Sequence, residues 1–317
     1  MFRRGNIFNE LNQSDNEIFM DLNSRDLEYV LSLINSYKLL LRDRINVDLD
    51  ETFGLEIECE NANWDKIGRR MALEWELTDD ASLENGAEIK SPPLRDTEEN
   101  WITLRNMCIM LSKYAQVGIN AGGHVHVGIQ ALGYKDEALI NFMKLWSVYE
   151  HVIYRFSYGE FIGPRPGIRD AAKSVQIEFA NMCYLYKQKY ANKDEIIHYL
   201  CGDKCNAVNF NHYTTFKTLE FRCPNASLNP VIWQNNVNLF VKMMLYASSD
   251  KFNNNFIEEK FSRIFIDEKT SNEIYVKDAL EFVDLIFDNN LDKIYFLRQY
   301  LKSFEASKDY EMAKTFC

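Results

Sequence analysis

The chain has 317 residues, of which 46% are hydrophobic and 26% charged, and its formal net charge is −11. A chain of this length can bury a full core, and the composition is that of a soluble globular protein. The acidic balance argues against general binding to duplex nucleic acid, because phosphate contacts need a surplus of Lys and Arg.

No targeting or membrane signal is evident at the sequence level. The first residues lack the apolar core of a secretory signal, and no apolar run approaches the length of a membrane span. Seven cysteines are scattered along the chain, an odd number with no CxxC pair, which is typical of reduced thiols. These features predict a cytoplasmic protein without a membrane or nucleic-acid partner.

The first half of the chain alternates between helical and strand patterns. Apolar residues at helical spacing predict a helix over residues 24–43. Period-two alternation predicts strands over 52–60 ("TFGLEIECE") and 71–78 ("MALEWELT"). A short strand, "AEIK" at 87–90, follows a turn and is ended by two prolines.

The second half begins with a predicted helix over 97–116, followed by the alternating, glycine-punctuated segment "VGINAGGHVHVGI". A long helix is predicted over 136–157, and helical patterns continue to about residue 200. A long β-like stretch follows at 206–223, "NAVNFNHYTTFKTLEFRC", and the remaining chain is mostly helical in pattern.

Strands with polar alternation mixed with long helices predict an α+β fold, with a mainly antiparallel sheet half-covered by helices. No composition break indicates a second globular unit. We therefore expect a catalytic domain at 51–248, a helical N-terminal extension at 1–50, and a helical C-terminal extension at 249–317 packed on the same body.

Four of the strand patterns carry charged or imidazole side chains at two-residue spacing, separated by apolar residues. If these strands share a sheet, one face is core and the other gathers the polar groups. The pairs are Glu56 and Glu58, Glu88 and Lys90, His124 and His126, and Glu220 and Arg222.

Such a face has the chemistry of a site for a hard cation. Carboxylate oxygens suit Mg²⁺ or Mn²⁺, and imidazole is compatible with either ion. A divalent cation would relieve the repulsion between closely packed carboxylates. Arg222, two places from Glu220, suits the oxygens of a metal-bound phosphate that the metal does not hold.

Each pair alone is also compatible with a solvated strand face, and the coincidence of four favours a site. His-x-His also occurs in barrel hydrolases and cupins, but their further ligands are missing at the required positions. "GIRDAAKS" at 167–174 resembles a phosphate loop but lacks its second glycine and follows a proline loop, so it favours a helix start.

Six segments in order resemble the amidoligase family: "FGLEIE", "LTDDASL", "AEIKSPPL", "GGHVHVG", "VNF" and "TLEFRCPNASLN". That family is a branch of the carboxylate–amine ligases similar to glutamate–cysteine ligase and, more remotely, glutamine synthetase. The resemblance spans about residues 52–245 and leaves both ends of the chain unmatched.

The resemblance implies an ATP-dependent ligase on a curved antiparallel sheet with a polar concave face, its other face covered by helices. Mg²⁺, with Mn²⁺ as an alternative, would lie between nucleotide and substrate. The implied metal ligands are Glu56, Glu58, Glu88, His126 and Glu220, with His124 and Asp80 as further candidates. Glu56, Glu58, Glu220 and Arg222 are the implied catalytic residues, and Arg222, Lys90, Asn209 and Arg165 or Arg169 are the implied cofactor-binding residues.

Two departures from the family pattern leave assignments open. Ala81 stands where a glycine is usual, so the further carboxylate is either Asp79 or Asp80. Lys90 stands where an apolar residue is usual and would reach the substrate carboxylate or the phosphates.

The resemblance implies that the substrates are an amino acid or peptide with a free carboxylate and an amine donor, joined through an acyl phosphate. Two alternatives remain at this point: a metal-dependent hydrolase that uses the same Glu/His face, and a noncatalytic binding module. The sequence leaves the oligomeric state open, a homo-oligomer included.

Overall fold

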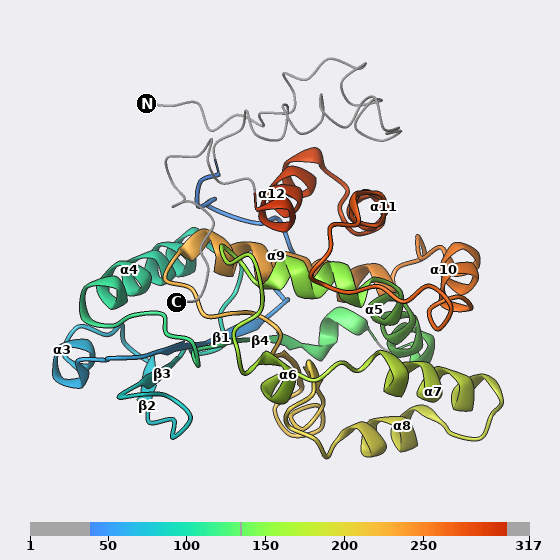
Figure 1. Ribbon diagram of the computed structural model, residues 1–317, viewed down its shortest axis with the longest axis horizontal. Coiled ribbons are helices and arrows are strands. Elements are labelled where there is room, and N and C mark those ends of the chain that lie inside the picture. Colours follow the sequence, from blue (N-terminus) through green and yellow to red (C-terminus); the bar gives the residue numbers. More distant parts are fainter. Residues whose placement is uncertain (1–38, 134, 303–317) are drawn as a thin grey trace.

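The computed structural model describes residues 39–133 and 135–302, which fold around one antiparallel sheet (Figure 1). The sheet has six strands in the order β2-β3-β1-β4-β6-β5, and all of its pairings are antiparallel. The strands are β1 (Phe53–Cys59), β2 (Glu76–Thr78), β3 (Ala87–Lys90), β4 (Gly123–Gly128), β5 (Val208–Asn209) and β6 (Thr218–Phe221). The predicted α+β class with a mainly antiparallel sheet is confirmed, and the finer likeness to glutamine synthetase stays a prediction.

Three long helices cover one face of the sheet, namely α4 (Glu98–Tyr114), α5 (Asp136–Ser157) and α9 (Pro230–Ser248) (Figure 1). Local sequence sets where two of them begin. The Thr97 hydroxyl caps α4 by accepting from the amide of Asn100, and Asn229 caps α9 immediately before a proline at its first position. The predicted helices over 97–116 and 136–157 are confirmed.

The remaining helices extend this body without starting a separate core. They are α3 (Trp64–Gly68), the 3₁₀ turn η2 (Ile129–Leu132), α6 (Ile168–Ala171), α7 (Gln176–Lys187), α8 (Lys193–Leu200), α10 (Asn254–Phe261), α11 (Val276–Ile286) and α12 (Asn290–Leu301). One buried apolar cluster runs from the strands to α12, where Phe296 stacks on Phe156 of α5 at 4.4 Å between ring centroids.

The core lies between the sheet and the long helices. Alternate residues of the strands point into it. Phe221 of β6 stacks on Phe240 and packs against Trp146, with ring-centroid distances of 4.1 and 5.9 Å. At the start of β4, a side chain on Gly123 would place its Cβ 2.1 Å from the Trp233 ring. The apolar layer is therefore packed directly against bare backbone at that point.

Two predicted strands are shorter than their patterns suggested. The alternation over 71–78 forms a strand only at β2, because Glu74 has a left-handed φ of 70° and Leu73 is 89% exposed. The long β-like stretch at 206–223 is divided into β5 and β6, because the backbone turns at residues 211–216.

The predicted helix over 24–43 falls mostly outside the described residues. Its described end, residues 39–43, is not helical. Leu39 is instead buried against Val231 and Tyr295, and the Tyr295 hydroxyl accepts from the amide of Leu40 at 2.9 Å. Tertiary contacts replace the helical hydrogen bonds of this segment.

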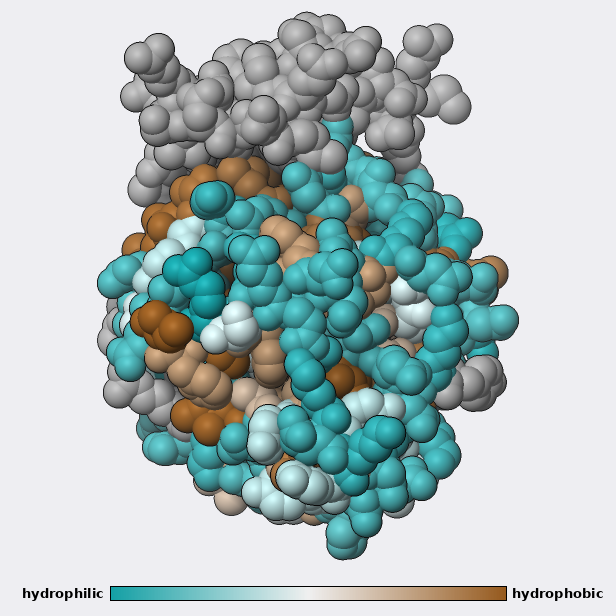
Figure 2. Space-filling model, turned by 90° about the vertical axis from the view of Figure 1, so that its right-hand side faces the viewer, coloured by the Kyte–Doolittle hydropathy of each residue, from teal (hydrophilic) through white to brown (hydrophobic). Residues whose placement is uncertain are grey.

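The end of the molecule that carries α7, α8 and α10 is mostly hydrophilic, with small apolar patches between the polar side chains (Figure 2). Within residues 39–133 and 135–302, no helix has both the length and the apolar character needed to cross a membrane.

Candidate active site

The register of the central strands sets the geometry of the polar face. Glu58 lies opposite Glu88, and Glu56 lies between Lys90 on β3 and His124 on β4. Side chains alternate along a strand, so these residues share the face that points away from the helices.

The same face continues across β4 and β6 to the edge of the sheet. His126 lies opposite Glu220, and Glu220 lies opposite Asn209 of β5. Between Glu220 and Arg222, Phe221 points into the core. Distant segments of the chain therefore contribute neighbouring side chains to one surface.

Three overlapping groups of these side chains each place three ligand atoms within 4.8 Å of one another, which is close enough to share one metal ion. Glu56 belongs to two groups and Glu88 to two. The groups are Glu56, Glu88 and His124; Glu56, His126 and Glu220; and Glu58, Asp80 and Glu88. We call these seven residues the acidic cluster, and they are the seven that the sequence analysis gave as metal ligands.

Asp80 joins the cluster from the loop between β2 and β3. Its Oδ1 accepts hydrogen bonds from the amide and the hydroxyl of Ser82 at 2.8 and 2.7 Å, which fix the turn. Asp79 is exposed and belongs to none of the three groups. The structure thus brings Asp80, and not Asp79, to the cluster.

His124 lies in the middle of the cluster and is 3% exposed. Its Nδ1 is 2.7 Å from Oε2 of Glu56 and 3.4 Å from Oε1 of Glu220, and its Nε2 is 3.4 Å from Oε1 of Glu58. Its Nδ1 is also 3.9 Å from Oε1 of Glu88. One imidazole therefore faces four carboxylates and can neutralise only one charge.

The two imidazoles leave hydrogen-bonding capacity unused. Nε2 of His126 is 3.2 Å from Oε1 of Glu56. Nevertheless, neither this atom nor Nε2 of His124 forms a properly oriented hydrogen bond within the described part of the chain, although both are buried. Buried nitrogens without partners, surrounded by carboxylate oxygens, fit a hard divalent cation such as Mg²⁺ or Mn²⁺.

The protonation equilibria reflect this crowding. Burial opposes the charge on Glu56, but its close contacts with His124 and His126 hold its pKa below the usual range. Burial and the neighbouring Glu56 charge raise the pKa of Glu88. Burial lowers the pKa of His126, but the contact with Glu56 and the negative charges of Glu56 and Glu220 together outweigh burial, so that the net shift is upward. A divalent cation at the cluster would favour the unprotonated forms of these groups, so its binding would compete with protons.

Two permanent cations border the cluster on the strands. The Arg222 guanidinium pairs with the Glu220 carboxylate, and its Nε donates to the carbonyl of Ala171 at 3.2 Å. Lys90 Nζ is 2.7 Å from Oε2 of Glu88 and 3.7 Å from Oε1 of Glu56. Both border the carboxylates of the cluster, and their binding of an anionic ligand stays a prediction.

Arg165 reaches the cluster from the loop after α5 and is 2% exposed. Its Nη1 is 3.2 Å from Oε2 of Glu58, and its Nε has no hydrogen-bond partner in the described part of the chain. A side chain on Gly122 would put its Cβ 1.3 Å from Nη1. The space that glycine leaves is therefore filled by the guanidinium. The side chain of Arg169 lies outside the described residues.

Asn209 contacts the cluster through Glu220. Its Nδ2 donates to Oε2 of Glu220 at 2.6 Å, and its Oδ1 accepts from the amide of Asn211. It therefore orients this carboxylate, and its role as a cofactor-binding residue stays a prediction. Glu60, the residue after β1, differs from the glutamates of that strand: its carboxylate accepts from the amide of Asn120 at 3.3 Å and stays outside the cluster.

Sequence reasoning missed two groups that support the site. Thr78 lies opposite Glu88 and donates to its Oε2 at 3.2 Å, which the register of β2 would have indicated. The second is the segment 171–175. Its Ala171 carbonyl accepts a hydrogen bond from Arg222. Two residues of α5 bind its backbone: the Tyr154 hydroxyl donates to the Ala172 carbonyl at 2.6 Å, and the Glu150 carboxylate accepts from the Val175 amide at 3.1 Å. Backbone carbonyls have no sequence signature, so this support could not be predicted.

Residues 71–244, more than half of the chain, match the family described as "Putative amidoligase enzyme". The match includes Asp80, Glu88, both histidines and Glu220 of the cluster, and it begins after β1. A search of curated proteins finds no match. By its sequence match, the chain belongs to the amidoligase family.

Proposed function

We propose that the protein is an ATP- and Mg²⁺-dependent carboxylate–amine ligase that forms an amide through an acyl phosphate. The observation that carries the proposal is the acidic cluster itself. It gathers five carboxylates and two imidazoles into three overlapping ligand groups, with Lys90, Arg165 and Arg222 alongside. Family membership supports the ligase class.

The chemistry explains why such a face is needed. A carboxylate is a poor electrophile, because oxide is not a viable leaving group. Transfer of the γ-phosphoryl group of ATP to a carboxylate oxygen releases ADP and gives an acyl phosphate. The amine nitrogen then attacks the acyl carbon, the C–N bond forms, and inorganic phosphate leaves. Phosphoryl transfer needs mainly charge neutralisation and alignment.

The residues of the chain divide this work. Glu56, with members of the three ligand groups, would hold the divalent cation, which supplies charge neutralisation for phosphate oxygens. Arg222 and Lys90 bind phosphate oxygens from the sides of the cluster. A cluster carboxylate that holds no cation accepts the proton of the attacking amine.

The test is ADP release from ATP and Mg²⁺ with a panel of carboxylate–amine pairs. A productive pair should release ADP and form one amide per ADP, whereas either substrate alone should not. We expect Glu220→Gln to lower this rate by about a hundredfold. Glu60→Gln is the matched control, because it makes the same substitution on the same face of the sheet but outside the cluster.

Nucleotide binding separates the alternatives. A metal-dependent hydrolase needs the cation but no ATP, and a noncatalytic module keeps its activity in Glu220→Gln. Calorimetric titration with a nonhydrolysable ATP analogue and Mg²⁺ should show binding that Glu220→Gln weakens. No heat from this titration, together with no ADP from the panel, would contradict the ligase proposal.

A further inference from the structure

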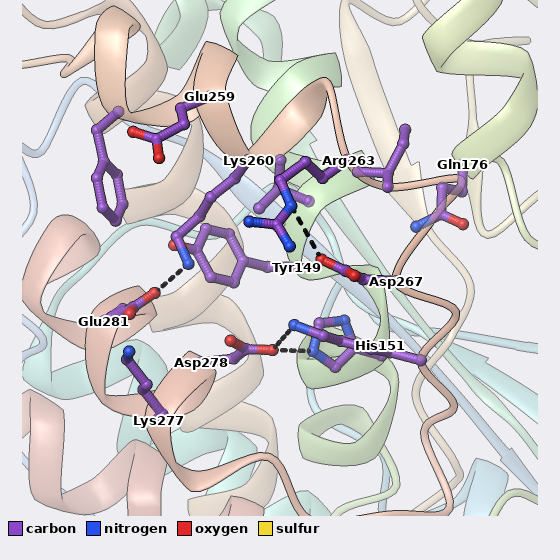
Figure 3. A pocket seen from close by; sticks show the side chains of 14 residues that line it. Tyr149, His151, Gln176, Glu259, Lys260, Arg263, Asp267, Lys277, Asp278 and Glu281 are labelled. Atoms are coloured by element: carbon purple, nitrogen blue, oxygen red, sulfur yellow. Dashed lines mark hydrogen bonds and ion pairs between the residues drawn. The ribbon is translucent and has the colours of Figure 1, made fainter. Parts of the chain in front are cut away.

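A polar cavity lies between α5, α10, α11 and the loop that joins the last two helices (Figure 3). Its volume is about 330 Å³, which is enough for a small metabolite. None of the residues that line it belongs to the acidic cluster. It is therefore a separate place on the molecule.

The lining contains four permanent cations and four carboxylates, and most of them pair with each other. Six of the eight form three ion pairs, which Figure 3 marks with dashed lines. The pairs are Lys260 with Glu281, Arg263 with Asp267, and Lys269 with Asp278. Asp278 also contacts Nε2 of His151 at 2.8 Å.

One cation and one carboxylate are left over. The side chains of Lys277 on α11 and Glu259 on α10 line the cavity, and neither forms an ion pair or hydrogen bond with another described residue. Figure 3 shows Glu259 above the Lys260–Glu281 pair and Lys277 below it. The cavity thus offers one charge of each sign to a ligand.

A buried hydroxyl in the same cavity also lacks a partner. Tyr149 lines the cavity and is 1% exposed, and its hydroxyl has no hydrogen bond within the described part of the chain. The backbone of α5 leaves helical geometry at this residue, with φ −115° and ψ 15°. A buried polar group without a partner and a break in a long helix are both features that concentrate at binding sites.

We propose that this cavity binds a free amino acid as a zwitterion. Its carboxylate pairs with Lys277, its ammonium pairs with Glu259, and a polar atom satisfies the Tyr149 hydroxyl. A polyanion such as a nucleotide is disfavoured, because four carboxylates offset the four cations of the lining and leave no net positive charge to hold it. The proposal rests on this cavity alone and does not need the ligase activity.

The experiment first measures thermal unfolding of the full chain with each proteinogenic L-amino acid. The strongest stabiliser is then titrated calorimetrically beside its N-acetyl derivative, which lacks the ammonium, and its amide, which lacks the carboxylate. We expect both derivatives to bind about fivefold more weakly, because each loses one partly exposed ion pair and such a pair contributes about that factor in affinity.

Variants then locate the bound amino acid. Glu259→Gln and Lys277→Gln should each weaken binding about fivefold, and both residues are exposed, so folding is not expected to change. Tyr149→Phe should weaken it severalfold through the lost hydrogen bond. Glu220→Gln, in the acidic cluster, should leave this binding unchanged.

Two results would overturn the proposal. One is the absence of stabilisation by any amino acid in the panel. The other is binding that Glu220→Gln removes and Glu259→Gln does not, which would place the amino acid in the acidic cluster. Neither measurement uses ATP or turnover, so failure of the ligase proposal leaves this one standing, and the reverse also holds.

Discussion

The acidic cluster and the cavity between α5, α10 and α11 are both rich in charged side chains, but their charges are balanced differently. In the cavity, four cations face four carboxylates, and three ion pairs leave one group of each sign. In the cluster, five carboxylates are accompanied by three permanent cations and two histidines.

This difference in charge balance indicates that the two regions suit different kinds of ligand. A buried excess of one sign is unfavourable and calls for a compensating ion, whereas a balanced set with one group of each sign left over calls for a zwitterion. The charge that remains after internal pairing is thus more informative than the number of charged residues.

Glu56→Gln should cause the largest change, because Glu56 belongs to two of the three ligand groups and faces both histidines. We expect the rate of ADP release to fall about a thousandfold, since two ligand groups lose a charged oxygen at once. Titration with Mn²⁺, followed by electron paramagnetic resonance, should show fewer or weaker bound ions. Unchanged Mn²⁺ binding would show that Glu56 is not a metal ligand.

Gly122→Ala should lower activity about a hundredfold by moving Arg165 away from Glu58. Gly54→Ala on β1 is the matched control, because its Cβ would lie 3.6 Å from the nearest atom, an ordinary contact with His126. Rates and melting temperatures of both variants check this. Equal effects of the two substitutions would show that Arg165 is not the sensitive group.

Glu150, on α5, is a buried carboxylate held by hydrogen bonds from Trp146, Ser174 and Val175. Burial raises its pKa, although these hydrogen bonds act in the opposite direction. A carboxyl group with a raised folded-state pKa stabilises the fold fully below its unfolded pKa of about 4.3, and this contribution is lost as pH rises through the folded-state value.

Glu150→Gln should therefore be more stable than the parent at pH 8. Its amide oxygen can accept from Trp146 and Val175, and its NH2 can donate to the Ser174 hydroxyl, without a buried charge. The advantage should shrink toward acidic pH, by up to about 1.4 kcal/mol per pH unit between the two pKa values. Urea unfolding at several pH values measures it. A constant difference across the series would mean that Glu150 does not titrate with folding.

Tyr149→Phe should have the smallest effect in the ligand-free protein. It removes a buried hydroxyl without a described partner, so the free energy of unfolding should rise by about 1 kcal/mol. Tyr154→Phe is the contrast, since its hydroxyl donates to Ala172 at 2.6 Å, and its loss should cost about 1 kcal/mol. A loss of stability in both variants would show that the Tyr149 hydroxyl is already satisfied.

The cluster could be predicted from sequence because each of its strands carries a local signal. In "LEIE", "AEIK", "HVHV" and "LEFR", apolar residues alternate with the polar ones, which places both polar residues on one face whatever the strand order. Asp80 needed tertiary structure, because a loop carboxylate beside a second aspartate has no periodicity. The strand predicted over 71–78 was too long, because a single residue with a left-handed backbone, Glu74, breaks an alternation that looks continuous in the sequence.

The cavity could not be predicted, because its parts share no pattern. Tyr149 and His151 belong to a helix whose period indicates only burial, while Glu259 and Lys277 look like ordinary solvated charges on two other helices. Only the packing of α10 and α11 against α5 brings them together. The anchoring of Arg222 by the Ala171 carbonyl is hidden in the same way, since every residue has a carbonyl.

Gly122, just before β4, and Gly123, its first residue, lie against different layers of the protein. A methyl group at position 122 would meet the Arg165 guanidinium, whereas one at position 123 would meet the Trp233 indole. Enlarging the first residue therefore disturbs the electrostatics of the catalytic surface, and enlarging the second disturbs the packing of the interior. Substitutions at these two adjacent positions should therefore affect different properties, namely catalysis at 122 and stability at 123.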